Sequence, residues 1–169
     1  NDNQDKTIAT DRYVGGPGGR SDALLVKASQ RVPFHWSDST KMNKTMSIRF
    51  DEYGWEWSCS FPIRNVGEFS VRLRNKHTHA RHLCRVQVCL VDSTLYVVFQ
   101  AEQRRLPPYR IENLSFETLH YHQEGVDEIE EVLLPYQTDR YTWDDLSSST
   151  SKVAQGMSLL FLLLIIEKY

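Results

Sequence analysis

Alternation of apolar and polar residues with a period of two runs through the middle of this 169-residue sequence, and it constrains the fold more than any other feature. Met46, Ile48 and Phe50 alternate with polar neighbours. Because successive side chains of a β-strand point to opposite faces, such a run predicts a strand with one buried and one exposed face. The same alternation recurs over residues 55–61, 69–74, 84–90 and 94–99.

Turn-forming residues separate these predicted strands. Asp92-Ser93 is expected to close a hairpin, and the segment from Asp51 to Gly54 is expected to form a turn. For residues 126–134, whose apolar positions also fit helical spacing, a strand is preferred. Shorter strands are predicted over residues 24–26, 109–111 and 118–122. We therefore expect an all-β fold, built as antiparallel β-sandwich repeats of an elongated array.

Charge and cysteine content narrow the function classes. The 20 Lys and Arg residues against 22 Asp and Glu residues leave a formal net charge of -2, so no nucleic-acid partner is expected. A hydrophobic content of 40% suffices for one sizeable core. The cysteines are odd in number and fall in predicted strands, which favours reduced thiols in a cytosolic setting. They are Cys59, Cys84 and Cys89.

Neither end of the sequence shares the pattern of the middle. Residues 1–22 are polar, and the glycines between residues 15 and 19 lack the strand and the Lys-Ser/Thr of a phosphate loop, which predicts a flexible loop. The start is expected to carry no secretory signal and to belong to a fragment. The apolar run over residues 157–166 is shorter than the roughly 20 residues of a spanning helix, so it is not expected to cross a bilayer alone.

Two signatures bracket residues 107–145. The opening Pro107-Pro108-Tyr109-Arg110-Ile111-Glu112-Asn113 leads into a strand. Asn113 stands where the alternation stops, and both halves of its amide could tie two strands together at a turn. A closing signature runs from Pro135 through Trp143 to Asp145, and a second one lies at residues 32–38. The chain is therefore expected to hold one repeat and the end of the preceding one.

These motifs resemble the adaptor-binding repeat region of the chorein, or vacuolar-protein-sorting-thirteen, family, also called the SHORT-ROOT-interacting domain. The resemblance covers residues 32–146 and includes Asp51 to Ser58, Ser60 to Ile63 and Val66 to Phe69. Residues 1–31, with their Gly-rich loop, match weakly, and residues 147–169 diverge as a Ser-rich linker and an apolar C-terminal tail. The repeat signature comprises Pro33, Trp36, Pro108, Tyr109, Ile111, Pro135 and Trp143.

The resemblance implies a non-enzymatic interaction module of a bridge-like lipid transfer protein. Such a module docks adaptor proteins with proline-containing motifs, which target it to organelle membranes and contact sites in vacuolar and endosomal protein sorting. It implies a cytosolic protein, peripheral at membranes and bound to them mainly indirectly, with neighbouring repeats of the same chain as further partners and no cofactor. It also assigns Asn113 a structural role. A purely structural β repeat and a β domain that contacts the membrane surface or phosphoinositides remain alternatives.

One cluster contains the residue types of a metal site. His77, His79, His82 and Cys84 could supply the four N and S ligands that zinc prefers. No second cysteine pair or acidic partner accompanies them, so a solvated loop is preferred and no metal site is expected. No nucleophile elbow and no ordered set of Ser, His and acidic residues is present, so an enzyme is not expected.

Basic residues are concentrated in the same part of the chain. Arg72, Arg74 and Arg85 are candidate contacts for a phosphate group or an acidic partner. Because they occupy the polar positions of predicted strands, solvation of an outward sheet face is the preferred explanation. Arg64, Lys76 and Arg81 extend the group.

Tryptophans offer a second candidate binding surface. Trp36, Trp55, Trp57 and Trp143 could line a groove for a proline-rich peptide. Trp55 and Trp57 share a face with Phe61 in the predicted strand, so burial in the core is preferred for both. Addition of an extended peptide to an exposed sheet edge is the more general mechanism.

Overall fold

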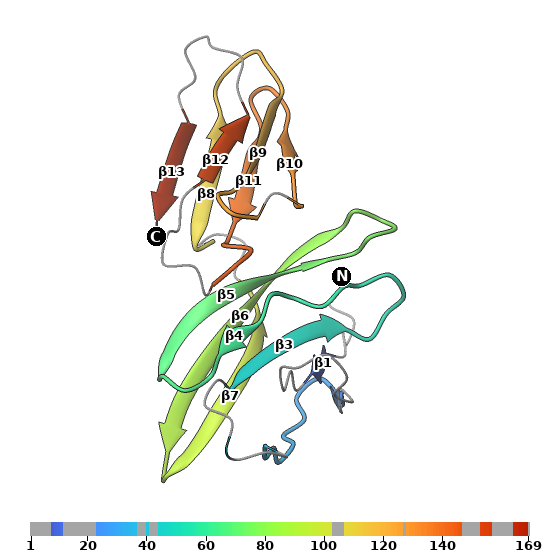
Figure 1. The fold of residues 1–169 in the computed structure, drawn as a ribbon, viewed down its shortest axis with the longest axis vertical. Coiled ribbons are helices and arrows are strands. Elements are labelled where there is room, and N and C mark those ends of the chain that lie inside the picture. The colour runs from blue at the N-terminus through green and yellow to red at the C-terminus, as the bar shows by residue number, and fades with distance from the viewer. Residues whose placement is uncertain are drawn as a thin grey trace. The chain divides into compact units, whose positions relative to one another are not determined.

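A computed structural model describes residues 8–11, 23–36, 40, 44–102, 107–126, 128–146, 153–156 and 164–168. These residues form antiparallel β-strands joined by turns, and this part of the chain contains no helix (Figure 1). The predicted all-β fold is confirmed. A helix long and apolar enough to span a membrane is accordingly not found in the ranges described. The chain divides into two compact units, unit 1 over residues 1–100 and unit 2 over residues 101–169.

Unit 1 contains two antiparallel sheets. One has the strand order β2-β1-β3-β4 and the other has the order β5-β6-β7. The strands of the first sheet are β1 (Ile8–Asp11), β2 (Leu24–Val26), β3 (Thr45–Phe50) and β4 (Phe61–Pro62). The strands of the second sheet are β5 (Gly67–Arg74), β6 (Arg81–Val91) and β7 (Thr94–Ala101).

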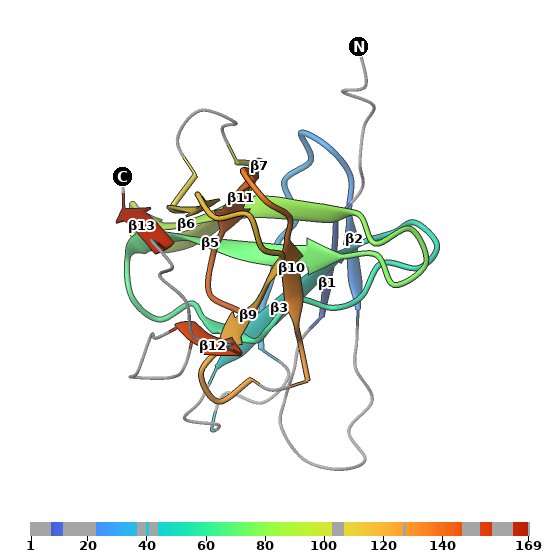
Figure 2. The ribbon, with the colours of Figure 1, turned by 90° about the horizontal axis from the view of Figure 1, so that it is seen from above.

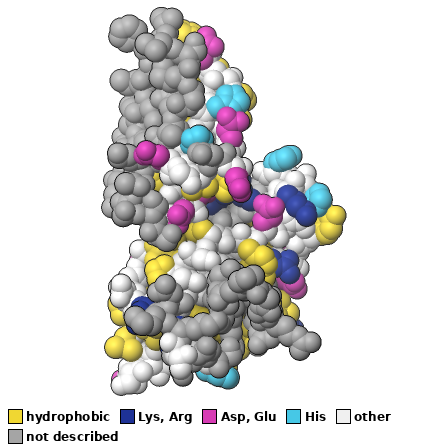
Figure 3. Space-filling model, viewed as in Figure 1, with side chains coloured by type: hydrophobic (Ala, Val, Ile, Leu, Met, Phe, Trp, Pro, Cys, Tyr) yellow, Lys and Arg dark blue, Asp and Glu magenta, His cyan; other side chains and the backbone are white. Residues whose placement is uncertain are grey.

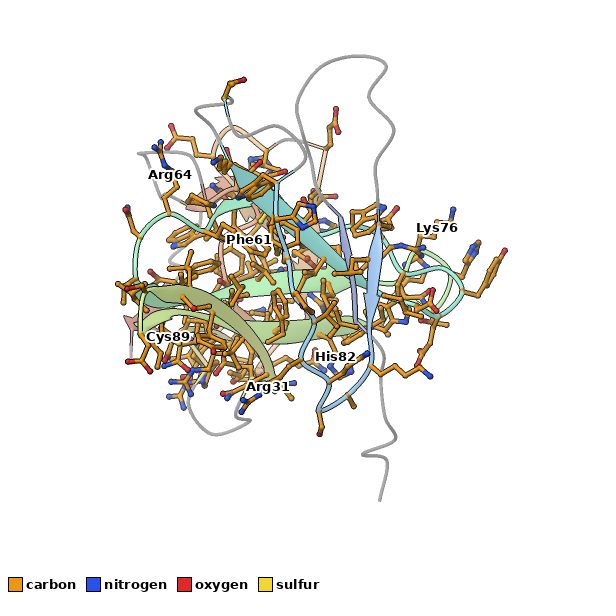
Figure 4. All side chains as sticks on the ribbon, turned by 90° about the horizontal axis from the view of Figure 1, so that it is seen from below. Arg31, Phe61, Arg64, Lys76, His82 and Cys89 are labelled. Atoms are coloured by element: carbon orange, nitrogen blue, oxygen red, sulfur yellow. The ribbon has the colours of Figure 1, made fainter. Side chains whose placement is uncertain are left out.

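The predicted hairpin of unit 1 is confirmed. Asp92 and Ser93 join β6 to β7 with φ angles of 47° and 67°, the pair of left-handed conformations that a tight two-residue hairpin turn requires. The core takes its side chains from the predicted apolar positions, and Figure 4 shows Phe61 pointing into the interior. Its buried hydrophobic residues are Met46, Ile48, Phe50, Trp55, Phe61, Ile63, Val71, Leu73, Cys84, Val86 and Val88.

The predicted strand over residues 55–61 is wrong for most of its length. Only Phe61 lies in a strand, and Trp55 forms an isolated bridge with Asn75. The reason is Ser58, whose main-chain N–H donates to the Ile48 oxygen at 2.8 Å while its hydroxyl oxygen accepts from the Ile48 N–H at 3.1 Å. The Ser58 hydroxyl thus takes the place of a main-chain oxygen as the acceptor for Ile48 of β3, and the regular ladder of main-chain bonds stops there.

The prediction that each strand has one buried and one exposed face also fails at two places in unit 1. Ser70 and Arg72 of β5 are buried, Arg72 to 4% exposure, because both faces of this strand are covered. Leu90 of β6 is exposed, since the register pairs Gly67, the first residue of β5, with Val88 and leaves the end of β6 beyond its neighbour.

Unit 2 consists of two three-stranded antiparallel sheets, with orders β11-β8-β13 and β10-β9-β12. Ile111 and Tyr141 from the first sheet and Leu119, Tyr121 and Leu133 from the second form one buried cluster. The strands are β8 (Tyr109–Asn113), β9 (Leu119–Gln123), β10 (Glu131–Leu133), β11 (Thr138–Tyr141), β12 (Val153–Gly156) and β13 (Leu164–Lys168). The strand preferred over a helix for residues 126–134 is therefore confirmed for its last part.

The segment expected to be a linker and an apolar tail contributes two of these strands. β12 lies beside β9 (Figure 2) and pairs with it, with Val153 opposite Gln123, and β13 pairs with β8, with Leu164 opposite Asn113. Pairing with β8 and β9 satisfies the main-chain N–H and C=O groups of β12 and β13. These two strands were not predicted, because this segment shows no alternation with a period of two. Residues 157–163 of the apolar run lie outside the described residues.

Candidate functional site

Asn113 is fully buried at the end of β8, and its side chain binds two other segments of unit 2. Its Nδ2 donates to the main-chain oxygens of Glu117 at 2.8 Å, Leu133 at 3.1 Å and Leu134 at 3.0 Å. Its Oδ1 accepts from the main-chain N–H of Ser115 at 2.9 Å and from the Ser115 hydroxyl at 2.7 Å. The amide therefore joins β8, the turn that follows it and the end of β10.

The main chain strengthens the same junction. The Asn113 N–H donates to the Gln137 oxygen at 2.9 Å, which continues the pairing of β8 with β11 by one residue. An asparagine suits this position because it offers donors and an acceptor on a short side chain. Aspartate would lack the donors, and serine would not reach the carbonyl groups.

The two loops that Asn113 ties together carry exposed apolar side chains. We call Leu114, Phe116, Leu134 and Tyr136 the apolar cap. Phe116 is 83% exposed and Tyr136 is 61% exposed, and their rings meet edge to face with centroids 5.5 Å apart. Tyr136 has a φ of 57°, a left-handed conformation held by the turn between β10 and β11. The cap thus presents two aromatic rings, in contact with each other, to solvent.

The repeat-signature residues of unit 2 pack around its core. Trp143 contacts Tyr109 and Tyr141, with ring centroids 5.2 Å and 5.4 Å apart, and Ile111 is fully buried. Pro108 and Pro135 are half-buried. In unit 1, Pro33 is exposed, and Trp36 is half-buried with its ring 5.0 Å from that of Phe34.

Gln123 binds the closing signature to β9, and sequence reasoning did not identify it. The side chain is fully buried. Its Oε1 accepts from the main-chain N–H groups of Asp144 at 2.7 Å and Asp145 at 2.8 Å, and its Nε2 donates to the Asp145 oxygen at 3.0 Å. Its position in the strand was a usable signal. Leu119, Tyr121 and Gln123 are alternate residues of β9, so all three side chains point to the buried face.

Asn75 in unit 1 forms bonds of the same kind and was also missed. Its Nδ2 donates to the Tyr53 oxygen at 2.8 Å, and its Oδ1 accepts from the N–H groups of His77 and Thr78, both at 3.0 Å. The signal was present in the sequence, because Val-Arg-Leu-Arg-Asn ends at Asn75 as Tyr-Arg-Ile-Glu-Asn ends at Asn113.

The structure does not bring the candidate zinc ligands together. His77 stacks on Tyr53, and His82 packs against the rings of Phe50 and Trp55. Cys84 is buried and forms no disulfide. His79 is exposed with a left-handed φ of 55°. Within the described ranges, no three His, Cys, Asp or Glu side chains are placed to hold a metal ion.

The candidate arginines do not form one patch either. Arg72 is buried, Arg74 is half-buried, and Arg85 is paired with Glu68. Arg64 and Lys76 lie at opposite ends of unit 1 in Figure 4. On the face seen in Figure 3, acidic and basic side chains are interspersed.

The four tryptophans likewise line no common groove in the described structure. Trp55 is buried, where its indole N–H donates to the Glu52 carboxylate at 3.2 Å. Trp57, expected in the core, is 39% exposed, because Ser58 takes the inward position, and it lies 5.1 Å from the Arg49 guanidinium. The most exposed aromatic side chains among the described residues are instead Tyr53, Phe116 and Tyr136.

Comparisons with known proteins point to one family. The model of the adaptor binding domain of vacuolar-sorting associated protein 13 matches residues 10–148. The chain is also similar to Intermembrane lipid transfer protein vps13D of Dictyostelium discoideum, with 30% identity over 124 residues. That match covers 72% of this chain and 3% of the relative, so the chain spans only a small part of the relative's length. The chain belongs to the vacuolar-sorting associated protein 13 adaptor binding domain family.

Proposed function

We propose that unit 2 docks adaptor proteins with proline-containing motifs at the apolar cap. Docking recruits a lipid transfer protein to organelle membranes and contact sites in vacuolar and endosomal protein sorting. The role is non-catalytic and needs no cofactor, and the protein is cytosolic and peripheral at membranes. Family membership supports adaptor binding, and the name of the Dictyostelium relative supports lipid transfer. Neighbouring repeats of the same long chain flank this module in the proposal.

The observation that carries the choice of surface is the Phe116 and Tyr136 pair. Aromatic rings favour contact with proline, whose polyproline conformation is already extended and loses little entropy on binding. The hydrogen bonds of Asn113 fix both loops of the apolar cap, so the free protein holds the rings in place before a peptide arrives. Leu114 and Leu134, also exposed, widen the apolar contact.

The test is a titration of a fluorescently labelled peptide containing Pro-x-Pro against the full 169-residue chain. The Phe116→Ala/Tyr136→Ala variant is expected to bind at least about tenfold more weakly, because loss of an aromatic anchor at an interface costs on the order of 1.4 kcal/mol or more. Tyr53→Ala is the matched control, since Tyr53 is 84% exposed and stacked on His77 in unit 1.

Two results would overturn the proposal. One is an equal affinity of the double variant and of Tyr53→Ala for the peptide, which would show that the peptide binds away from the apolar cap. The other is an unchanged affinity when both prolines of the peptide are replaced by alanine, which would show that the chain does not recognise proline.

A purely structural role is the second candidate, and the Asn113 contacts favour it. It predicts that no proline-containing adaptor peptide binds the wild-type chain, while changes at Asn113 still lower the free energy of unfolding. The peptide titration and a denaturation curve, measured on the same preparations, therefore separate the two roles.

A further inference from the structure

The β7 strand is an edge that lacks the usual protection against pairing. In the sheet order β5-β6-β7, its only strand neighbour among the described residues is β6. Its sequence, Thr-Leu-Tyr-Val-Val-Phe-Gln-Ala, contains neither a charge nor a proline over 8 residues. Natural sheets place charges, prolines or bulges on edge strands, because an unpaired row of N–H and C=O groups accepts another strand.

The other edge of the same sheet shows the contrast. β5 carries Glu68, Arg72 and Arg74, and the chain after it continues into the Asn75 bridge with Trp55. On β7, Leu95 is 40% exposed and Tyr96 is 41% exposed. A strand added along β7 would cover both side chains without burying a charge.

The sequence of β7 is complementary to itself in one antiparallel register. Two residues that lie directly opposite each other in an antiparallel pair behave alike. Either both point their N–H and C=O groups toward the partner strand, or both point them away from it. Because two identical edges expose the same alternate residues, the two-fold axis must lie midway between the two copies of one residue. When that residue is Val97, Tyr96 faces Val98 of the second copy and Leu95 faces Phe99 of the second copy. These are aromatic with β-branched and aromatic with aliphatic pairs, which stabilise sheets.

A register centred on Val98 would give less favourable side-chain pairs between the two copies. Tyr96 would then face Gln100 of the second copy, and Leu95 would face Ala101 of the second copy. We propose that β7 is a self-complementary edge on which a second copy of this chain adds its own β7, in the register centred on Val97. Two three-stranded sheets thereby join into one continuous sheet. Because β7 carries no charge, the two edges do not repel each other.

The first experiment measures the mass of the full chain by light scattering over a broad range of concentrations. A monomer–dimer equilibrium is expected, and Tyr96→Lys is expected to remain monomeric because it places an ammonium group on the paired edge. Val66→Lys is the control, since Val66 is exposed outside the strands. A wild-type chain that stays monomeric throughout would overturn the proposal, as would a Tyr96→Lys dimer.

The register is tested by cross-linking in a Cys59→Ser/Cys89→Ser background. Val97→Cys is expected to form a disulfide between copies, because residue 97 faces itself and antiparallel partners lie within disulfide reach. Leu95→Cys is the matched control. Its two copies would lie four residues apart along the strands, about 13 Å, which is too far for a disulfide. Cross-linking of Leu95→Cys to the same extent, or none by Val97→Cys in a dimeric sample, would overturn the register.

Discussion

The Asn113 side chain donates a hydrogen bond to the main-chain oxygen of Leu134, 21 residues further along the chain, at 3.0 Å. This bond holds the turn after β8 against the turn after β10. Four further bonds of the same amide act at the same place, and no part of the side chain reaches solvent. The exposed rings of Phe116 and Tyr136 lie on the two loops that these bonds join.

Asn113→Ser is expected to lower the free energy of unfolding by about 2 to 4 kcal/mol, because buried carbonyl groups lose their donor and a cavity forms. Asn113→Asp should cost at least as much, since a carboxylate would face the oxygens of Leu133 and Leu134. Denaturant titration measures both changes. Asn65→Ser is the control, because Asn65 is exposed. A loss equal to that of the control would contradict the structural role.

Asn75→Ser is expected to destabilise unit 1 in the same way, with a smaller cost of about 1 to 3 kcal/mol, because Asn75 has one distant acceptor, Tyr53. Hydrogen exchange measured peptide by peptide separates the units. Faster exchange is expected in β5 and β6 for Asn75→Ser and in β8 and β10 for Asn113→Ser. Identical exchange patterns for the two variants would show that the units do not open separately.

The sequence pattern predicted those strands whose two faces have different surroundings. The alternation at Met46, Ile48 and Phe50 reports burial directly, and the hairpin turn at Asp92 and Ser93 has local conformational requirements. The pattern failed where a side chain substitutes for the main chain, as at Ser58. It also failed at Arg72, because both faces of β5 are buried around this residue.

The candidate site was predictable to a similar degree. Asn113 was identified because it stands where an alternation stops and belongs to a recognisable signature. Gln123 and Asn75 make equivalent bonds, with partners up to 22 residues away in sequence, much as Asn113 does. They were missed because neither stands in the recognised signature, although the position of each, in or directly after its strand, marks it. The exposure of Phe116 and Tyr136 was also not predicted, because aromatic residues are more often buried.

Gly54→Ala is expected to destabilise unit 1 by more than its backbone conformation alone explains. Gly54 has a φ of +83°, and an added Cβ would lie 2.6 Å from His77 Cδ2 and 2.7 Å from Asn75 Oδ1. Gly125→Ala is the matched control, because Gly125 has a φ of +84° with nothing within 4 Å of the added Cβ.

Both alanine variants should lose about 1 to 2 kcal/mol from the left-handed backbone. Gly54→Ala should lose a further 1 kcal/mol or so, because Asn75 must move from its bonds to His77 and Thr78. Thermal denaturation of both variants gives the comparison. Equal losses would mean that the Asn75 amide adapts freely to the methyl group.

Gln123→Leu is expected to release the closing signature from β9. Leucine fills a similar volume, but the N–H groups of buried Asp144 and half-buried Asp145 would lose their acceptor. The free energy of unfolding should fall by about 2 to 4 kcal/mol. Hydrogen exchange should accelerate at residues 144 and 145 before it does in β8, because these two N–H groups depend on Gln123 directly.

Gln87→Leu is the matched control, because Gln87 lies exposed on β6 and its replacement removes no buried partner. It should change the free energy of unfolding by no more than about 0.5 kcal/mol. If Gln123→Leu leaves exchange at residues 144 and 145 unchanged, the closing signature is held by the packing of Trp143 on Tyr109 and Tyr141, and the glutamine bonds contribute little to its position.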